Sequence, residues 1–202
     1  MTKEPRTDTR DRILEAACKL FREKGMDGVN VRELADAAAV NKGLLHYYFK
    51  SKEAILQEVV VHEIEGFYHA LNVLLQEPGS LHDKVPALVN SYFQLLERSP
   101  GLPAFILFEM QRDPAVLSRT TVPASLQQVV DAVEPELKRA RVPQERASGV
   151  HFVLDVVGLC AFTFGTVQGL SKLMKFTKAQ RAAFLEARKV HIIALIRQGL
   201  KP

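Results

Sequence analysis

The chain has 202 residues, with 27 basic and 23 acidic side chains and only two cysteines. This length suits one large domain, or a small domain and a medium one, and it can bury a sizeable core. Cys18 and Cys160 lie in distant segments of different pattern, which excludes a disulfide framework or a cysteine-rich zinc site and favours a reduced cytoplasmic compartment. Residues 1–12 lack the apolar core of a signal peptide.

The net charge of +4 is distributed unevenly along the chain. Residues 1–53 have 11 basic and 9 acidic side chains, residues 54–136 have 4 and 11, and residues 137–202 have 12 and 3. The basic total therefore does not by itself indicate one nucleic-acid face. The apolar run from Val150 to Leu170 contains His151 and Asp155, so a buried helix is favoured over a membrane span.

Helical spacing dominates the N-terminal quarter of the chain. Apolar positions from Ile13 to Phe21 predict a first helix, with Asp8 or Thr9 as its cap and Gly25 as its stop. Asn30, with Glu33 three residues later, has the pattern of a capping box and opens a short second helix. The expected inner face of this helix is Val31, Leu34, Ala35 and Ala38.

The remaining helices follow from similar signals. Asn41 is expected to cap a third helix to about Phe49, and Ser51 a fourth that ends near Leu75. Thr177 and Gln180 repeat the capping-box pattern before a last helix that ends near Gly199. Between them, helices are predicted over residues 81–98, 103–112 and 144–174, with one or two pieces in 115–140 that Pro123 and Pro135 interrupt. The sequence thus predicts an all-α fold.

Residues 31–38 and 42–49, joined by a tight turn, form a helix-turn-helix pattern. At about 100° per residue, Leu45, Tyr48 and Phe49 fall on one face of its second helix. The opposite face has small and polar side chains, and lysines lie at both ends. The helix is therefore expected to pack by one face and to present the other.

The presented face suits a DNA groove. His46 and Tyr47 can donate to phosphate or contact a base edge, and Leu44 can contact a thymine methyl group. The pattern leaves open that these residues are ordinary packing with solvated lysines, because such units also occur as scaffolds. The predicted DNA-contacting residues are Arg32, Asn41, Lys42, Gly43, Leu44, His46, Tyr47 and Lys52.

The segments "VRELADAAAV" and "KGLLHYYFKSKEAIL" resemble the N-terminal domain of the TetR family of bacterial transcription repressors, over residues 10 to about 60. The chain departs from the family pattern at two positions. His46 stands where the family usually has a phosphate-contacting tyrosine, and Ala39 stands where the turn usually has glycine. The positions that match are Gly43, Leu45, Phe49, Lys52 and Leu56.

The resemblance implies a fold and a domain organisation. An N-terminal three-helix helix-turn-helix DNA-binding domain, residues 1–55, is expected to join a larger helical ligand-binding and dimerisation domain, residues 56–202. TetR-like proteins dimerise through their last two long helices. In residues 144–174 small side chains form one stripe, which suits close helix approach, although packing within the chain or a bend remains an alternative. The predicted dimer interface is Gly158, Ala161, Gly165, Gly169, Ile193 and Arg197.

The larger domain is rich in aromatic residues, most of which must be core. Some are expected to line an apolar ligand cavity, with Glu109, Gln111, His151 and Asp155 as candidate polar groups. The predicted lining residues are Phe67, Phe93, Phe105, Phe108 and Phe152.

Other chemistry is weakly supported. Glu58, His62, Glu65 and His69 share one helical stripe, but an exposed polar stripe explains them better than a metal site. No catalytic set stands out, so neither enzyme activity nor a cofactor is expected.

The sequence therefore predicts a cytoplasmic, homodimeric regulator, most simply a repressor released from a palindromic DNA operator by a small apolar or aromatic effector. An alternative is a structural or cell-division DNA-binding protein on the same fold, without an effector.

Overall fold

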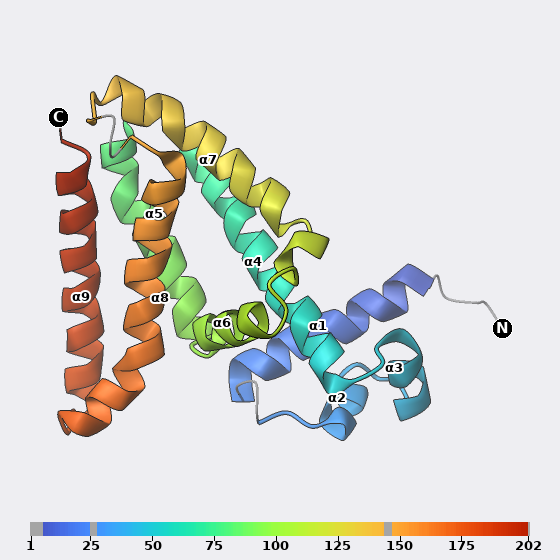
Figure 1. Ribbon diagram of the computed structural model, residues 1–202. Helices are drawn as coiled ribbons and strands as arrows, with labels where there is room; N and C mark the ends of the chain where they lie inside the picture. The colour runs from blue at the N-terminus through green and yellow to red at the C-terminus, as the bar shows by residue number, and fades with distance from the viewer. Residues whose placement is uncertain (1–5, 25–27, 144–146, 202) are drawn as a thin grey trace. The chain divides into compact units, whose positions relative to one another are not determined.

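The computed structural model describes residues 6–24, 28–143 and 147–201, and these ranges are helical without a β-strand (Figure 1). The chain divides into two compact units, Met1–Glu63 and Ile64–Pro202. The division lies inside the long helix α4, Lys52–Gln76. The boundary expected near residue 55 lies within the same helix.

The first unit contains α1 (Arg6–Lys24), α2 (Val31–Ala37), α3 (Lys42–Tyr48) and the start of α4. Its core consists of apolar side chains from all four helices, among them Ile13, Leu34, Leu45, Phe49 and Ile55, each at most 2% exposed. Packing of α1 on α2 and of α2 on α3 gives the predicted helix-turn-helix.

Both expected caps in this unit are present. The side-chain oxygen of Asn30 accepts hydrogen bonds from the backbone N–H groups of Arg32 and Glu33, each at 3.0 Å, and the Glu33 carboxylate accepts from Asn30 N–H at 3.2 Å. This is the complete capping box. Ser51 Oγ accepts from Ala54 N–H at 3.1 Å and caps α4.

Two local predictions for this unit are wrong. Helix α1 already includes Arg6, so Asp8 and Thr9 lie inside it rather than capping it. Thr9 is 7% exposed and belongs to the packed part of the helix. Val31, expected on the inner face of α2, is exposed because the first turn of this short helix extends beyond its packing contact. The expected stop at Gly25 lies outside the described residues.

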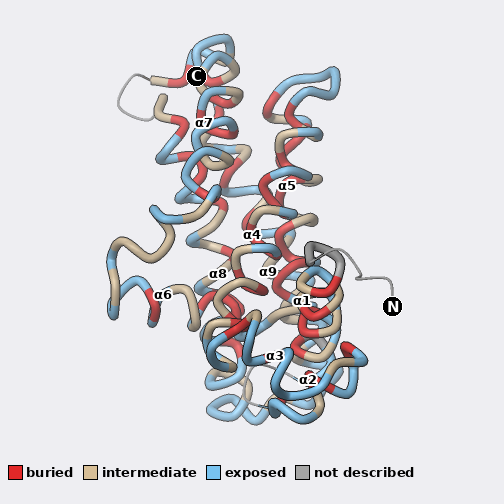
Figure 2. Tube along the Cα trace, turned by 90° about the vertical axis from the view of Figure 1, so that its right-hand side faces the viewer, coloured by how far each residue is buried: buried red, intermediate tan, exposed pale blue. Residues whose placement is uncertain are grey.

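In its described residues, the second unit contains five α-helices besides the remainder of α4, with the short 3-10 turn η1 (Leu117–Arg119) before α7. Helix α8 is its centre, because it contacts each of the other four (Figure 1). Figure 2 shows buried and exposed stretches alternating along the helices, as expected where each packs by one face. The five are α5 (Leu81–Arg98), α6 (Leu102–Arg112), α7 (Val122–Arg139), α8 (Gly149–Leu173) and α9 (Lys178–Gly199).

Helix α8 is the one helix in the described ranges that is long and apolar enough to cross a membrane by length and composition. One of its faces is buried within the second unit, where Phe152, Val156 and Cys160 belong to the core. Burial raises the pKa of the Cys160 thiol to about 12. Cys160 is therefore a protonated core residue at neutral pH.

The expected interruption at Pro135 is absent, since α7 continues through it. Proline removes one backbone donor and leaves the carbonyl four residues earlier, that of Asp131, without its helical partner. Both residues are exposed, so water can satisfy that carbonyl. The second capping box is confirmed: Thr177 Oγ1 accepts from Gln180 N–H at 3.2 Å, and Gln180 Oε1 accepts from Thr177 N–H at 2.9 Å.

The turn between α2 and α3 contains a strained residue. Ala39 has φ 53°, in the left-handed region. Its N–H donates to Asp36 O at 3.1 Å and Val40 N–H donates to Ala35 O at 2.9 Å, the pairing of a Schellman motif. The left-handed conformation has a steric cost of about 1–2 kcal/mol for alanine, and glycine does not have this cost.

We expect Ala39→Gly to stabilise the first unit by about 0.5–1 kcal/mol, because relief of the left-handed strain exceeds the entropy that glycine adds to the unfolded chain. Hydrogen exchange of the α2 and α3 amides measures this. The matched control is Ala37→Gly, which lies in the helix with ordinary angles and should destabilise by a comparable amount. Faster exchange in the Ala39→Gly variant would contradict the argument.

Candidate nucleic-acid interface

The rotation of α3 about its axis is determined by two buried side chains. Leu45 and Phe49 are each 2% exposed. The Arg10 guanidinium lies 5.2 Å from the centre of the Phe49 ring, in cation–π geometry, and is ion-paired with Glu58 of α4. Arg10 therefore connects α1, the end of α3 and α4.

The opposite face of α3 is presented to solvent. Gly43, His46 and Tyr47 are exposed, and Tyr47 retains 56% of its accessible surface. Leu44, also exposed, borders this face. Tyr48, predicted on the packed face with Leu45 and Phe49, is half-buried, and its ring lies edge-to-face to that of Tyr47 at 5.3 Å.

Asn41 is used within the chain. Its side-chain oxygen accepts a hydrogen bond from Leu44 N–H at 2.7 Å and caps α3. A Cβ atom at Gly43 would lie 3.3 Å from that same oxygen, closer than ordinary contact. Glycine at this position therefore leaves room for the cap as well as for a close backbone approach by a ligand.

Basic side chains surround the presented face. Lys42 and Lys50 are exposed at the two ends of α3, and Lys52 is half-buried in the first turn of α4. Arg32 of α2 lies 3.9 Å from Asp36, and both side chains are largely exposed. Such a pair contributes little, so the guanidinium is available to another anion.

Two contacts hold the helix-turn-helix against α1. Arg12 donates to the carbonyl of Ala38 at 3.2 Å, next to the strained turn. Lys24 pairs with Glu33 at 2.7 Å. The Lys24 hydrogen bond, and then the Asn30 N–H, lower the pKa of Glu33, so this contribution to stability is present above the ordinary carboxyl pKa and is lost as the pH falls through the lowered value.

Arg10 and Arg12 of α1 were not among the predicted site residues. A signal was available, because Arg10 precedes the core residue Ile13 by one helical turn, on the side that packs.

The aromatic residues predicted to line a ligand pocket are dispersed in the second unit. Phe67 packs on Tyr92 with ring centres 4.6 Å apart, and Phe93 packs edge-on to Phe164 at 5.2 Å. Phe105 is half-buried on α6, and Phe108 is exposed there. Phe152 lines two cavities.

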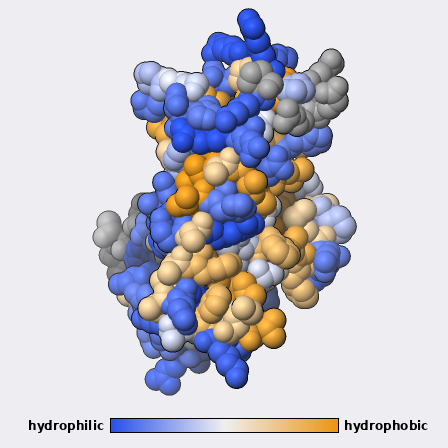
Figure 3. Space-filling model, turned by 90° about the vertical axis from the view of Figure 1, so that its left-hand side faces the viewer, coloured by the Kyte–Doolittle hydropathy of each residue, from blue (hydrophilic) through white to orange (hydrophobic). Residues whose placement is uncertain are grey.

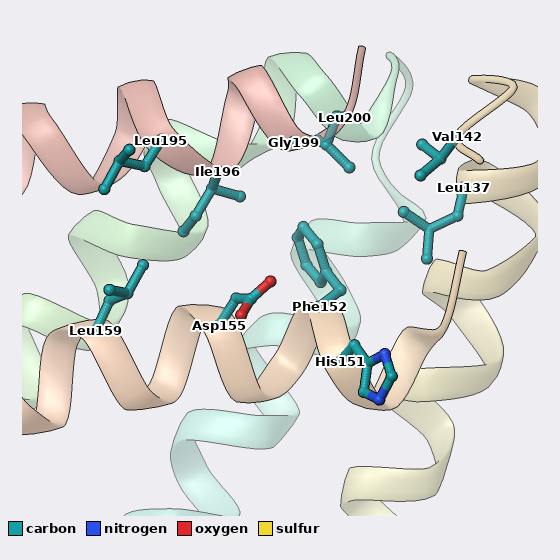
Figure 4. Close-up of a pocket in the computed structure, with 10 residues that line it drawn as sticks. All are labelled: Leu137, Val142, His151, Phe152, Asp155, Leu159, Leu195, Ile196, Gly199 and Leu200. Atoms are coloured by element: carbon teal, nitrogen blue, oxygen red, sulfur yellow. The ribbon is translucent and has the colours of Figure 1, made fainter. Parts of the chain in front are cut away.

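The smaller cavity, of about 20 Å³, is wholly apolar and includes Phe67 together with residues of α4, α5, α7 and α8. The larger, of about 390 Å³, lies where α7 ends, α8 begins and α9 ends (Figure 4). His151 and Asp155, both predicted as polar pocket groups, line the larger cavity. Glu109, another such candidate, is instead buried on α6 and ion-paired with Arg112 at 2.5 Å.

The predicted interface residues of α8 face open space. A Cβ atom built on Gly158, Gly165 or Gly169 would meet no atom of another element within 4 Å, so no other helix of the chain packs against these three glycines. Ala161 and Ile193 are half-buried. Arg197 donates to His82 O at 3.0 Å, a contact within the chain.

Large apolar side chains are exposed beside this glycine stripe. Phe162 is 71% exposed on α8, and Val190 is 59% exposed on α9. Figure 3, viewed from the side on which α9 lies in Figure 1, shows an apolar area on that face.

Two residues of the predicted polar stripe on α4, Glu58 and Glu65, have partners in other parts of the chain. Glu58 pairs with Arg10, and Glu65 accepts a hydrogen bond from Thr121. Across the described ranges, no three His, Cys, Asp or Glu side chains are grouped so that they could hold a metal ion.

Comparison with known proteins identifies the first unit. Residues 13–59 match the family described as bacterial regulatory proteins, tetR family. The chain is 39% identical over 66 residues to a probable HTH-type transcriptional regulator, YttP of Bacillus subtilis, covering 33% of this chain and 32% of that protein. It is 30% identical over 88 residues to the transcriptional repressor KstR2 of Mycolicibacterium smegmatis, covering 44% and 43%. The chain thus spans a third to a half of these relatives.

Solved structures match the whole fold. The fatty acid degradation regulator FadR from Bacillus halodurans aligns with a TM-score of 0.64 and 18% identity over 99% of this chain and 96% of that one. The transcriptional regulator FadR from Bacillus subtilis, solved in complex with stearoyl-CoA, aligns with 0.61 and 18% over 94% and 98%. At this identity the likeness establishes the fold alone.

We expect the double change His46→Ala with Tyr47→Ala to leave the stability of the first unit nearly unchanged while weakening binding to duplex DNA. Phe49→Ala is the matched buried variant, and it should lower the free energy of unfolding by about 3–5 kcal/mol. Thermal unfolding and a DNA-binding titration measure the two effects. An equal loss of melting temperature in both variants would contradict the two-faced assignment of α3.

Proposed function

Because the chain belongs to the TetR family of bacterial regulatory proteins, we propose that it is a dimeric transcriptional repressor in the cytoplasm that a small molecule releases from a palindromic operator. The observation that carries the proposal is the division of α3 into a buried face, with Leu45 and Phe49, and a presented face, with Gly43, His46 and Tyr47.

The presented face supports major-groove contact. An α-helix fits this groove, and the exposed Gly43 allows close approach of its backbone. His46 and Tyr47 can hydrogen-bond phosphate or a base edge, and Leu44 can contact a thymine methyl group. Lys42, Lys52 and Arg32 supply the positive charge that phosphate contact requires. Asn41 contributes to DNA contact indirectly, because its side chain caps α3 and orders the first turn of that helix.

A dimer follows from the geometry of operator contact. Two copies related by a twofold axis would place their α3 helices in consecutive major grooves, roughly 34–36 Å apart. The α8 stripe of Gly158, Ala161, Gly165 and Gly169, with Ile193 of α9, is the proposed seam. Arg197, which donates a hydrogen bond to His82 O of its own chain, would lie at the rim of this seam.

The effector would bind in the second unit. The apolar cavity that includes Phe67 and Phe152 lies between α4 and α8, and α4 continues into the first unit. An apolar or aromatic molecule that enlarges this cavity would favour one arrangement of α4, and release requires that it bind that arrangement more tightly than the DNA-bound one. Phe93, Phe105 and Phe108 would respond to such a change rather than touch the molecule.

Footprinting on the DNA upstream of the protein's own gene tests DNA recognition, with a palindromic protected site as the expected result. On that site we expect Arg32→Ala, Lys42→Ala and Lys52→Ala each to lower the salt slope of binding by about one unit, as loss of one phosphate contact does. Lys138→Ala, an exposed lysine of α7, is the matched control and should leave the slope unchanged. Slopes unaltered in all three variants would locate the recognition surface elsewhere.

For the dimer, we expect Gly165→Leu or Gly169→Leu to convert the protein to monomers through steric overlap at the seam. Leucine has a higher helix propensity than glycine, so the change does not weaken α8 itself. Gly66→Leu on α4, another helical glycine with open space around its Cβ position, is the matched control and should remain dimeric. Light scattering at micromolar concentration measures the mass. A monomeric wild type, or dimeric seam variants, would show that the interface lies elsewhere.

A further inference from the structure

The larger cavity of the second unit has the features of a small-molecule site. Its volume of about 390 Å³ falls in the range of roughly 300–1,000 Å³ typical of such sites. Residues of α7, α8 and α9 line it (Figure 4), and it is open to solvent on the side where His151, Asp155 and Leu195 are exposed. Its apolar lining residues are Leu137, Val142, Phe152, Leu159, Leu195, Ile196 and Leu200.

The polar part of the lining is restricted to the first turns of α8. Asp155 extends from α8 toward α9, and His151 lies one helical turn earlier at the edge of the cavity (Figure 4). With histidine neutral, the lining residues therefore carry one negative charge and no positive charge. Within the described ranges Asp155 has no hydrogen-bond or ion-pair partner.

This carboxylate stands out against the charge of its surroundings. Residues 137–202 have 12 basic and 3 acidic side chains. Of the other two acidic residues, Glu186 pairs with Lys189 at 2.7 Å, and Glu145 lies outside the described residues. Asp155 is exposed, so water solvates its carboxylate in the free protein. An apolar body packed over the seven apolar side chains beside it would remove part of that water, and a cationic group on the same molecule would replace it.

We propose that this cavity binds a small lipophilic amine, with the ammonium group on Asp155 and the apolar body against Phe152, Leu159 and Leu195. The site shares Phe152 with the apolar cavity between α4 and α8 but has otherwise different lining residues, and the proposal does not depend on release from DNA. An ammonium group donates a charge-assisted hydrogen bond to the carboxylate.

The same lining disfavours other classes of ligand. A neutral molecule of equal shape would cover Asp155 without replacing the water it loses, and an anion would add repulsion. The excess of basic residues in the surrounding segment repels cations in general. Selective amine binding would therefore be due to the local carboxylate.

The experiment uses three probes of matched shape: 4-phenylbutylamine, 4-phenylbutanol and 4-phenylbutyrate. At pH 7 these are a cation, a neutral molecule and an anion. In calorimetric titrations of the full chain, the amine is expected to bind roughly ten- to a hundredfold more tightly than the alcohol, the range for one hydrogen bond to a charged group. The acid is expected to bind least.

Two variants with matched controls assign the site. Asp155→Asn should remove the preference for the amine, whereas Asp131→Asn, an exposed aspartate on α7 outside the cavity, should keep it. Leu195→Trp fills the cavity from a partly exposed position and should abolish binding, whereas Leu107→Trp on α6 should not. The proposal is overturned if the wild type binds none of the probes, if the acid binds as tightly as the amine, or if Asp155→Asn leaves amine affinity unchanged.

Discussion

Burial of Leu45 and Phe49 sets the rotation of α3 about its own axis, and the surface of the first unit depends on that rotation. Full burial of each side chain stabilises the unit by about 1.5–3 kcal/mol, so a turn of α3 that exposed them would be costly. His46 and Tyr47 face solvent because they lie on the side of α3 opposite the buried Leu45 and Phe49. Arg10 reinforces the choice, since its position over the Phe49 ring and its ion pair with Glu58 oppose any rotation.

Helix α8 also has a buried face and an exposed face, but the glycines on its exposed face lower helix stability, and no packing contact within one chain offsets this loss. Its three glycines at positions 158, 165 and 169 each reduce helix stability by about 1 kcal/mol relative to alanine, yet each faces open space. Their neighbours on that face include the exposed Phe162. Close approach by a helix of a second copy would bury this face, and the space that the three glycines leave would allow that approach. The glycine content of α8 is therefore explained by the proposed dimer.

The parts of the fold that sequence could predict are those that local hydrogen bonds determine. The capping boxes at Asn30 and Thr177 need only residues three positions apart, and both are present. The ends of α2, α7 and α8 at Ala37, Arg139 and Leu173 lie within one residue of the predicted ends. Glycine does not mark these ends, because Ala39, Arg141 and Lys175 adopt positive φ with exposed side chains, and a pair of backbone hydrogen bonds to the last turn holds each of them.

Which aromatic residues line a cavity could not be predicted from the sequence. Aromatic content cannot distinguish Phe93, which is fully packed in the core, from Phe152, which lines both cavities, because the difference lies in how closely neighbouring helices approach. His151 and Asp155 could be predicted because polar residues in an apolar helical run need a reason that apolar ones do not. Their spacing of four places them on one exposed side of α8, and only the ends of α7 and α9 decide that this side borders a cavity.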